Sequence, residues 1–535
     1  MSEWGPIWPS MRAEAHFQDR VVTCFVDRLS GLQQLLLSAC EKNPKGDAII
    51  CGDQRLKYPD LLIQSTQFAR GLEKHGITKG DRVAILLNNR LEFVVALFAI
   101  ARLGAIAVPI SVREQAVGIA YVLEHCGAKA VVHEPDLADL LPVIDEASQL
   151  RYRIAVGTCD GSDFFNEWLL DDKPSTIAEI AEEDTAVILY TSGTTGRPKG
   201  AMLTNLGIVH SSMHYQTAMG LSAEDCSIAA VPLSHVTGLI ALITTMMLCG
   251  GKLVIMPKFN AKDFLSLGQR ERMTHTLMVP AMYNLCLLQE EFVRCDLSHW
   301  RIGGFGGAPM PMATIETLRY KIPSLTLMNC YGSTETTSPA TIIPQGQVER
   351  HLDSVGVSVA CAQIKVMDDA GCEVPPGSLG EIWIKGPMVV PGYWNNSEAT
   401  SENFMAGFWR SGDIGSIDVD GYVKVVDRKK DMINRGGYKI YTTEVENVLY
   451  SHPKVEECAV VSKPCTVLGE RVHAFIMTND DSVKSEELTA YCETRLSDYK
   501  VPESFTLTKQ ALPRNANGKL LKKVMRDSLI ERTTT

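Results

Sequence analysis

The chain has 535 residues and a formal net charge of −11, with 45% hydrophobic and 21% charged residues. This composition excludes a long disordered chain, collagen and a coiled-coil rod. The acidic balance disfavours a general nucleic-acid binder, which needs a basic surface. At ~100–200 residues per domain, the length predicts two to four structural units.

The cysteines and the apolar stretches indicate a cellular compartment. The 15 cysteines are scattered and form no C-x-x-C pair, so we expect reduced thiols rather than a zinc ribbon or a disulfide framework. Residues Met1 to Pro9 contain no basic segment followed by an apolar one, as a signal peptide would. The longest apolar stretch, Leu239 to Gly251, is shorter than the ~20 residues of a membrane span. We therefore expect a cytoplasmic protein without a transmembrane segment.

Short apolar runs alternate with helical patterns through the first half of the chain. Helices are predicted at 91–103 and, fully buried, at 239–248. Continuous apolar runs separated by helices are typical of parallel sheets covered on both faces. Strands are predicted at 82–87, 105–109, 130–133, 186–190 and 252–256.

The last quarter of the chain has a different pattern. A strand at 421–426 is followed by a cluster of charges and glycines, where a hinge or linker is expected. A helix is predicted at 443–450, with Thr442 or Thr443 as its cap and Glu446 in its first turn. Two strands (457–461 and 472–477) and a helix (485–496) follow. We predict two domains, 1–427 and 428–535.

A loop rich in glycine and hydroxyl groups directly follows the predicted strand 186–190. It reads Tyr190-Thr-Ser-Gly-Thr-Thr-Gly-Arg-Pro-Lys-Gly200. Glycines let backbone N–H groups approach an anion, and hydroxyls and a lysine add donors and charge, so this loop is predicted to hold phosphate. It is not a Walker A loop, because Gly200 stands where the magnesium-binding hydroxyl would follow Lys199. Any magnesium ion must therefore be held by another residue.

Six further motifs accompany this loop, in order, over nearly the whole chain. With them the sequence resembles the adenylate-forming superfamily, which comprises acyl- and aryl-CoA synthetases, peptide-synthetase adenylation domains and beetle luciferases. The resemblance implies an α/β fold with a large N-terminal body of stacked, helix-covered sheets and a small mobile α+β C-terminal domain. The motifs are Leu103-Gly-Ala-Ile-Ala-Val-Pro109, Asn329-Cys-Tyr-Gly-Ser-Thr-Glu335, Gly380-Glu-Ile-Trp-Ile-Lys-Gly386, Trp409-Arg-Ser-Gly-Asp-Ile-Gly415, Asp427-Arg-Lys-Lys-Asp-Met-Ile433 and Pro513-Arg-Asn-Ala-Asn-Gly-Lys519.

The resemblance implies a binding site for ATP and Mg²⁺. Tyr331 would stack on adenine, Asp413 would accept both ribose hydroxyls, and Glu335 would hold the magnesium ion. The full set implied for ATP or AMP is Thr191, Ser192, Gly193, Thr194, Thr195, Lys199, Gly307, Ala308, Pro309, Asn329, Tyr331, Gly332, Thr334, Asp413, Arg428 and Lys519.

The resemblance also implies two half-reactions with coenzyme A as the co-substrate. A carboxylate attacks the α-phosphate of ATP to give acyl-AMP and pyrophosphate, and a thiol then displaces AMP. Lys519 would bridge the carboxylate and the α-phosphate, with Lys199 and His235 as further catalytic residues. Lys430 matches a hinge, and Gly436, Gly437 and Tyr438 would line the path of the thiol.

The predicted acyl pocket has small side chains at several positions and no lysine or arginine. His235 matches a family aromatic that guards the carboxylate entrance. A substrate with a second acidic group would want an arginine or lysine in the wall, and these stretches contain neither, so we expect a largely apolar fatty or aromatic acid. The wall candidates are His235, Val236, Thr237, Ala241, Tyr283, Phe305, Gly306 and Gly332.

Three alternatives remain open at this point. The enzyme could load a carrier-protein phosphopantetheine instead of free CoA, since the motifs would be nearly the same. An oxygenase of the luciferase kind is disfavoured, because Gly436 stands where luciferases carry a second lysine. A non-catalytic nucleotide-binding protein is disfavoured because Glu335, Asp413 and Lys519 are all present. The sequence predicts no oligomeric state and does not select the residues that would bind the CoA nucleotide.

Overall fold

The computed structural model describes residues 8–143, 149–173, 175–191, 197–308, 310–514 and 520–531. The contacts between residues divide the chain into two compact units. Unit 1 consists of Met1–Ile364, Trp383–Arg410 and Asp420–Val423; unit 2 consists of Lys365–Ile382, Ser411–Val419 and Lys424–Thr535. The boundary expected between residues 427 and 428 stays a prediction.

Unit 1 contains a seven-stranded sheet that confirms four of the predicted strands. All its strand pairs are parallel except β10 with β11. The order is β11 (Lys199–Thr204), β10 (Thr185–Thr191), β6 (Ile106–Pro109), β5 (Arg82–Leu86), β7 (Ala128–His133), β8 (Tyr152–Ala155) and β9 (Asp163–Phe164).

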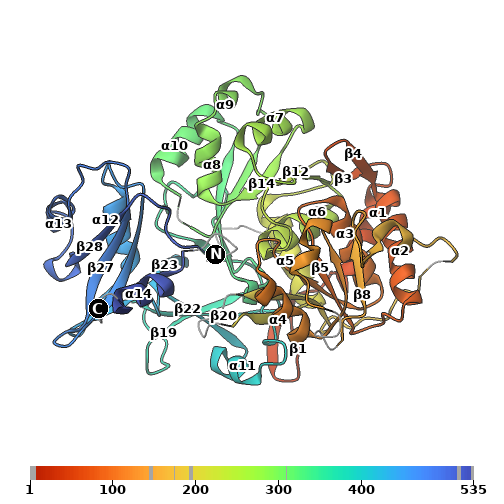
Figure 1. Cartoon of the computed structure of the whole chain (residues 1–535), viewed down its shortest axis with the longest axis horizontal. Coiled ribbons are helices and arrows are strands. Elements are labelled where there is room, and N and C mark those ends of the chain that lie inside the picture. The colour runs from red at the N-terminus through yellow and green to blue at the C-terminus, as the bar shows by residue number, and fades with distance from the viewer. Residues whose placement is uncertain are drawn as a thin grey trace. The chain divides into compact units, whose positions relative to one another are not determined.

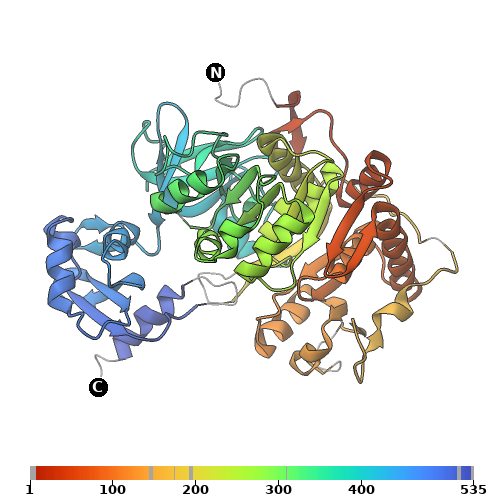
Figure 2. The same cartoon turned by 90° about the horizontal axis from the view of Figure 1, so that it is seen from above.

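Both faces of this sheet are buried, because alternate residues of its strands enter different cores. Val83 and Ile85 of β5 join the core that contains helices α2 (Tyr58–Lys74) and α3 (Leu91–Arg102), whereas Ala84 and Leu86 join the core below α4 (Ala116–Cys126). This period of two explains why the strand reads as a continuous apolar run. Figure 1 shows α3 beside β5, and Figure 2 shows the same layers from above.

A second sheet of unit 1 positions most of the candidate site residues. Its central strands are parallel, so that their carboxyl ends lie along one edge. Its strands up to β18 are, in order, β4 (Gln54–Lys57), β3 (Asp47–Cys51), β13 (Lys252–Ile255), β12 (Cys226–Ala229), β14 (His275–Met278), β15 (Ile302–Phe305) and β16 (Thr326–Tyr331), followed by the antiparallel β17 (Thr341–Ile342) and β18 (Gly356–Ser358).

The buried segment predicted as a helix at 239–248 has a different geometry. It forms a π-helix, Thr237–Thr244, which continues as the α-helix α6, Thr245–Cys249. The hydroxyls of Thr244 and Thr245 both donate to the carbonyl oxygen of Ile240, at 3.0 and 2.8 Å. Such side-chain bonds compete with the regular backbone ladder. The prediction of a buried helix is confirmed, and its first part is π-helical.

Unit 2 contains a five-stranded sheet with helices on both faces. Cys458 and Val460 of β26 (Glu457–Cys465) face the core of α12 (Thr442–Tyr450) and α13 (Ser485–Glu493). Ala459 and Val461 face α14 (Lys522–Glu531). The other strands are β24 (Ile433–Arg435), β25 (Tyr438–Ile440), β27 (Gly469–Met477) and β28 (Ser504–Thr508).

The start of α12 differs from the expectation. Tyr441 is the N-cap and Glu444 is the acidic residue of the first turn, so neither Thr442 nor Thr443 is the cap and Glu446 lies further along. The Thr442 hydroxyl instead donates to the Asp427 carboxylate, at 2.9 Å. Asp427 lies at the end of β23 (Tyr422–Arg428). Its carboxylate thereby takes the hydrogen bonds at the start of α12 that a capping side chain would otherwise take.

All fifteen cysteines are free thiols, as expected. Among the described helices, none has the length and the hydropathy that crossing a bilayer requires.

Buried neutral histidines make the stability of unit 1 depend on pH. Desolvation by burial lowers the pKa of His210 and of His275 to about 4, and that of His214 to about 3. In α5 (Asn205–Met219), His210 accepts a hydrogen bond from the Phe25 backbone N–H at 3.1 Å, which only an unprotonated nitrogen can do.

We expect stability to be full above pH ~6.5 and to fall as the pH decreases from there toward 4. The unfolded histidines take up protons near 6.5 whereas the folded ones do not, which costs about 1.4 kcal/mol per pH unit for each histidine. Thermal midpoints measured between pH 7.5 and 4.5 check this. His210→Gln should flatten the slope, and His299→Gln, at a half-buried position, should not. Equal slopes for both variants would contradict the assignment.

Candidate functional site

The loops that carry most of the candidate residues lie along one edge of the second sheet. His235 follows β12, Tyr283 follows β14, and Gly306 follows β15. Phe305, at the end of β15, is paired in register with Asn329 of β16. The parallel register therefore brings together side chains from segments more than 90 residues apart. Ser192, Gly193, Thr194, Thr195, Pro309 and Lys519 lie outside the described residues.

Glu335 is a buried carboxylate, 7% exposed, in the short 3₁₀ helix Thr334–Thr336. Its Oε1 accepts hydrogen bonds from the Tyr393 hydroxyl at 2.9 Å and from the Thr191 hydroxyl at 3.4 Å. Its Oε2 accepts one from the Ser333 hydroxyl. No lysine or arginine of the described chain forms an ion pair with it. A buried carboxylate held only by hydroxyls is a donor set that fits a hard divalent cation.

Lys199 is the buried first residue of β11, and its side chain lies beside Tyr393. Its Nζ is 5.2 Å from the centre of the Tyr393 ring, and the residue is 8% exposed. The Thr191 hydroxyl, at the other end of the loop, contacts the Lys199 carbonyl oxygen at 3.4 Å. The two ends of the predicted phosphate loop are therefore adjacent to each other and to Glu335.

The residues expected around the adenine base lie at the ends of β15 and β16. Gly307, Ala308 and Gly332 are exposed, whereas Tyr331 and Thr334 are half-buried. Asn329, expected to bond the base, is 9% exposed, and its side-chain amide donates to the Ser354 carbonyl oxygen at 3.2 Å.

Asp413 and Arg428 are paired within unit 2. The Nε of Arg428 is 2.6 Å from Oδ1 of Asp413, which is 3% exposed. The Ser411 hydroxyl accepts from the backbone N–H of Asp413 at 3.0 Å and donates to the Ile382 carbonyl oxygen at 2.6 Å. Asp413 is therefore an acceptor held in place beside a cationic partner, Arg428.

The candidate acyl residues divide into accessible and buried ones. His235 is exposed, yet desolvation by the surrounding chain lowers the pKa of its imidazole. Thr237 and Gly306 are half-buried, whereas Val236, Ala241, Tyr283 and Phe305 are buried.

Two features fix the packing around Tyr283 and the end of β15. The Tyr283 hydroxyl donates to the Gly304 carbonyl oxygen at 2.7 Å, and its ring stacks on Trp300, with 5.8 Å between the centroids. A Cβ at Gly306 would lie 2.3 Å from the Cys330 carbonyl oxygen. The end of β15 thus approaches β16 more closely than a side chain at Gly306 would permit.

The residues expected to meet the thiol form a tight hairpin in unit 2. Gly436 and Gly437 connect β24 to β25 with φ angles of 59° and 94°, and such a two-residue turn with positive φ favours glycine. Tyr438 is 59% exposed and stacks on Tyr499, with 4.8 Å between the centroids. Lys430 is exposed in the turn after β23.

Sequence reasoning did not find Tyr393, which contacts both Glu335 and Lys199. It lies 58 residues from Glu335 in the chain. The only signal was a Pro-Gly turn followed by two aromatic residues, Pro391-Gly-Tyr-Trp394. Ser333, which also donates to Glu335, lay within a motif but was not assigned a role.

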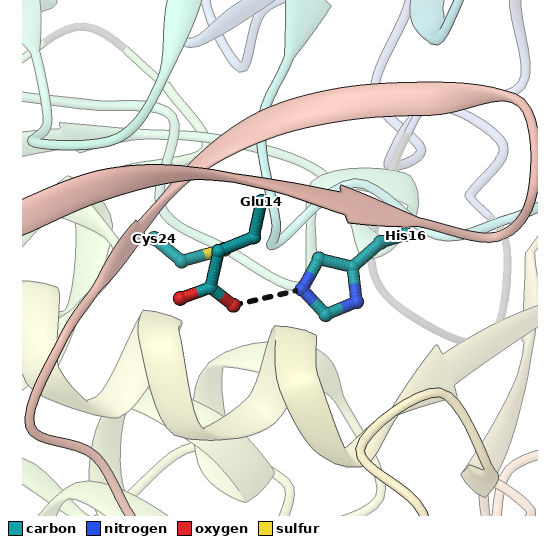
Figure 3. A group of neighbouring side chains, drawn as sticks. All are labelled: Glu14, His16 and Cys24. Atoms are coloured by element: carbon teal, nitrogen blue, oxygen red, sulfur yellow. Dashed lines mark hydrogen bonds and ion pairs between the residues drawn. The ribbon is translucent and has the colours of Figure 1, made fainter.

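A second cluster has the composition of a metal site but not its charge. Glu14, His16 and Cys24 lie together on the hairpin of β1 (Met11–His16) and β2 (Arg20–Phe25) (Figure 3). Arg28 and Arg12 each approach the Glu14 carboxylate to 2.7 Å and hold its pKa well below the usual range. Burial raises the pKa of the Cys24 thiol to about 12. The carboxylate is already neutralised and the thiol protonated, which disfavours a bound cation.

Comparison with known proteins gives the family. The AMP-binding enzyme family matches residues 36–394, and the AMP-binding enzyme C-terminal domain matches residues 444–519. A feruloyl-CoA synthase of Amycolatopsis is 34% identical, covering 92% of this chain and 98% of that protein. A long-chain-fatty-acid–CoA ligase of Mycobacterium tuberculosis is 34% identical over 89% of this chain and 93% of that protein.

A solved structure has the same fold. It is an o-succinylbenzoate coenzyme A synthetase of Bacillus subtilis in complex with ATP and magnesium ion, with a TM-score of 0.82 and 31% identity, covering 93% of this chain and 99% of that one. The chain therefore belongs to the AMP-binding enzyme family and has its α/β fold, with a large N-terminal domain and a smaller C-terminal one.

Gly306→Ala tests the close approach of β15 and β16. The new Cβ would meet the Cys330 carbonyl oxygen, so the two strand ends must separate and the loop residues after them shift. We expect ATP affinity, measured by calorimetry, to fall at least tenfold. Gly268→Ala in α7 (Ala261–Glu271), whose Cβ would meet only the side-chain ends of Met273 and Leu297, at 3.3 and 3.4 Å, should leave it unchanged. Retained affinity in Gly306→Ala would refute the constraint.

Proposed function

We propose that this member of the AMP-binding enzyme family activates a largely apolar carboxylic acid, aromatic or fatty, and transfers it to coenzyme A. The chain is an AMP-forming carboxylate–CoA ligase, and its substrates include ATP and CoA. The observation that carries the proposal is Glu335, a buried carboxylate to which, among the described residues, only hydroxyls donate from side chains, placed beside both ends of the phosphate loop. The carrier-protein alternative is not favoured, because the relatives are named for CoA.

In the proposed reaction the magnesium ion would be held by Glu335, which supplies the oxygen ligand that the phosphate loop lacks. When bound, the ion would neutralise charge on the phosphates. Lys199 and the hydroxyls of the loop would hold the phosphates. Asp413 would accept the ribose hydroxyls, and Tyr331 would stack on the base.

The chemistry consists of two balanced steps. A carboxylate oxygen attacks the α-phosphorus of ATP, the bond to the β-phosphate bridging oxygen breaks, and pyrophosphate leaves. The thiol of CoA then loses its proton to the solvent, and the thiolate attacks the acyl carbon. The bond from that carbon to the former carboxylate oxygen breaks, and AMP leaves with this oxygen. Lys519 would stabilise the charge that develops in the first step, and the hairpin at Gly436 would admit the thiol in the second.

The acyl residues support an uncharged substrate tail. Val236, Ala241 and Phe305 are apolar and buried. His235 is exposed, and its lowered pKa keeps the imidazole neutral at pH 7, so it offers hydrogen bonding rather than a countercharge. A second acidic group on the substrate would lack a cationic partner among these residues. The fifteen free thiols support a cytoplasmic location.

A screen of pyrophosphate release tests the substrate. We expect ATP- and CoA-dependent release with fatty or aromatic monocarboxylic acids, at least tenfold faster than with dicarboxylic acids of similar size. Preference for a dicarboxylic acid would overturn the assignment of an apolar substrate. Release that requires a carrier protein instead of CoA would restore the alternative.

Lys519→Ala separates the two half-reactions. We expect it to lower the rate of pyrophosphate release at least a hundredfold, because the negative charge on the α-phosphate loses its counter-ion. Thioester formation from preformed acyl-AMP and CoA should stay within a fewfold of the wild-type rate. Lys523→Ala, at a neighbouring lysine of α14, is the control. A normal rate of pyrophosphate release by Lys519→Ala would contradict the role proposed for this lysine.

A further inference from the structure

Tyr393 lies at the point where the metal carboxylate and the phosphate loop meet. It stands in the segment between β20 (Gly380–Lys385) and α11 (Ser397–Asn403) and is 5% exposed. Its hydroxyl donates to Oε1 of Glu335 at 2.9 Å, the shorter of the two bonds which that oxygen accepts. A hydrogen bond to a charged acceptor is about twice as strong as a neutral one, so Tyr393 is a main restraint on this oxygen.

The backbone around Tyr393 is fixed to the strand that leaves the phosphate loop. The Trp394 N–H donates to the Gly200 carbonyl oxygen at 2.8 Å, and the Met202 N–H donates to the Gly392 carbonyl oxygen at 3.2 Å. Tyr393 itself forms an antiparallel bridge with Ala201. The tyrosine is therefore held by β11, whose first residue is Lys199.

A second link runs from Glu335 back to the same segment. The Val390 N–H donates to the Glu335 carbonyl oxygen at 3.0 Å. The helix turn that carries Glu335 is thus attached to the Tyr393 segment through both its backbone and its side chain. Movement of the carboxylate relative to β11 would require breaking one of these bonds.

The ring of Tyr393 contacts the lysine of the loop. Nζ of Lys199 lies 5.2 Å from the ring centre, within the range of a cation–π interaction. The Tyr393 side chain thus contacts the Glu335 carboxylate with its hydroxyl and the Lys199 ammonium with its ring. Because the two charges are not paired directly, each keeps its interaction capacity for a ligand.

We infer that Tyr393 is a positioning residue, which fixes the Glu335 carboxylate relative to Lys199 so that both meet the magnesium complex of ATP. The inference rests on the proposed function. Residues that orient a metal ligand in this way contribute to metal affinity without touching the metal.

Tyr393→Phe keeps the ring and removes only the hydroxyl. We expect the Mg²⁺ concentration that half-saturates the enzyme, titrated calorimetrically in the presence of a non-hydrolysable α,β-methylene analogue of ATP, to rise about tenfold. Affinity for the analogue in excess EDTA should change less than twofold. Tyr58→Phe is the matched control, because that hydroxyl is also buried and bonded to a carbonyl oxygen, Gly251, away from the site.

Tyr393→Leu removes the ring as well. We expect it to weaken binding of the analogue in EDTA severalfold, since Lys199 loses its aromatic partner. An unchanged Mg²⁺ requirement in Tyr393→Phe, or an equal loss with and without metal, would overturn the role of the hydroxyl. Unchanged metal-free binding in Tyr393→Leu would overturn the role of the ring.

These outcomes are distinguishable from failure of the proposed function. If the wild type releases no pyrophosphate with any acid, the proposed function fails, while the titrations still decide the role of Tyr393. If the wild type is active and Tyr393→Phe matches it in Mg²⁺ affinity, only the inference about Tyr393 fails.

Discussion

The compensation of one buried charge, the Glu335 carboxylate, constrains the arrangement of this site. Removing a carboxylate from water is expensive unless its lone pairs are satisfied. In this structure the donors are three hydroxyls, from Thr191, Ser333 and Tyr393. Hydroxyls satisfy the lone pairs without cancelling the charge, so the site retains an electrostatic preference for a cation.

Three separate segments of unit 1 are bound together by this requirement. Thr191 ends β10, Ser333 follows β16, and Tyr393 precedes α11. The two sheets therefore supply one donor each, and the segment of Tyr393 attaches to both of them through β11 and the turn at Glu335. The position of the carboxylate depends on how these segments pack, and the glycine at 306 lets the neighbouring strand ends approach closely.

The sequence was sufficient for the strands and for the order of the motifs, and insufficient for contacts made across the fold. The runs at 82–87 and 186–190 identify strands because both faces are buried. The π-helix at Thr237–Thr244 was not predictable from apolar periodicity, since that pattern does not distinguish a π-helix from an α-helix. Tyr393 was missed because its partner is set by packing across the fold and not by spacing along the chain.

The two carboxylates proposed for the nucleotide have different environments, and this difference favours a different ligand at each. Asp413 is paired with Arg428 at 2.6 Å, so its charge is compensated, and a compensated carboxylate suits neutral donors such as ribose hydroxyls. A cation would be repelled by the guanidinium there. Glu335 has hydroxyl partners and no ion pair in the described chain, so a cation gains more there than a hydroxyl does. If the environments of Asp413 and Glu335 were exchanged, the metal would be favoured at Asp413 and the ribose at Glu335.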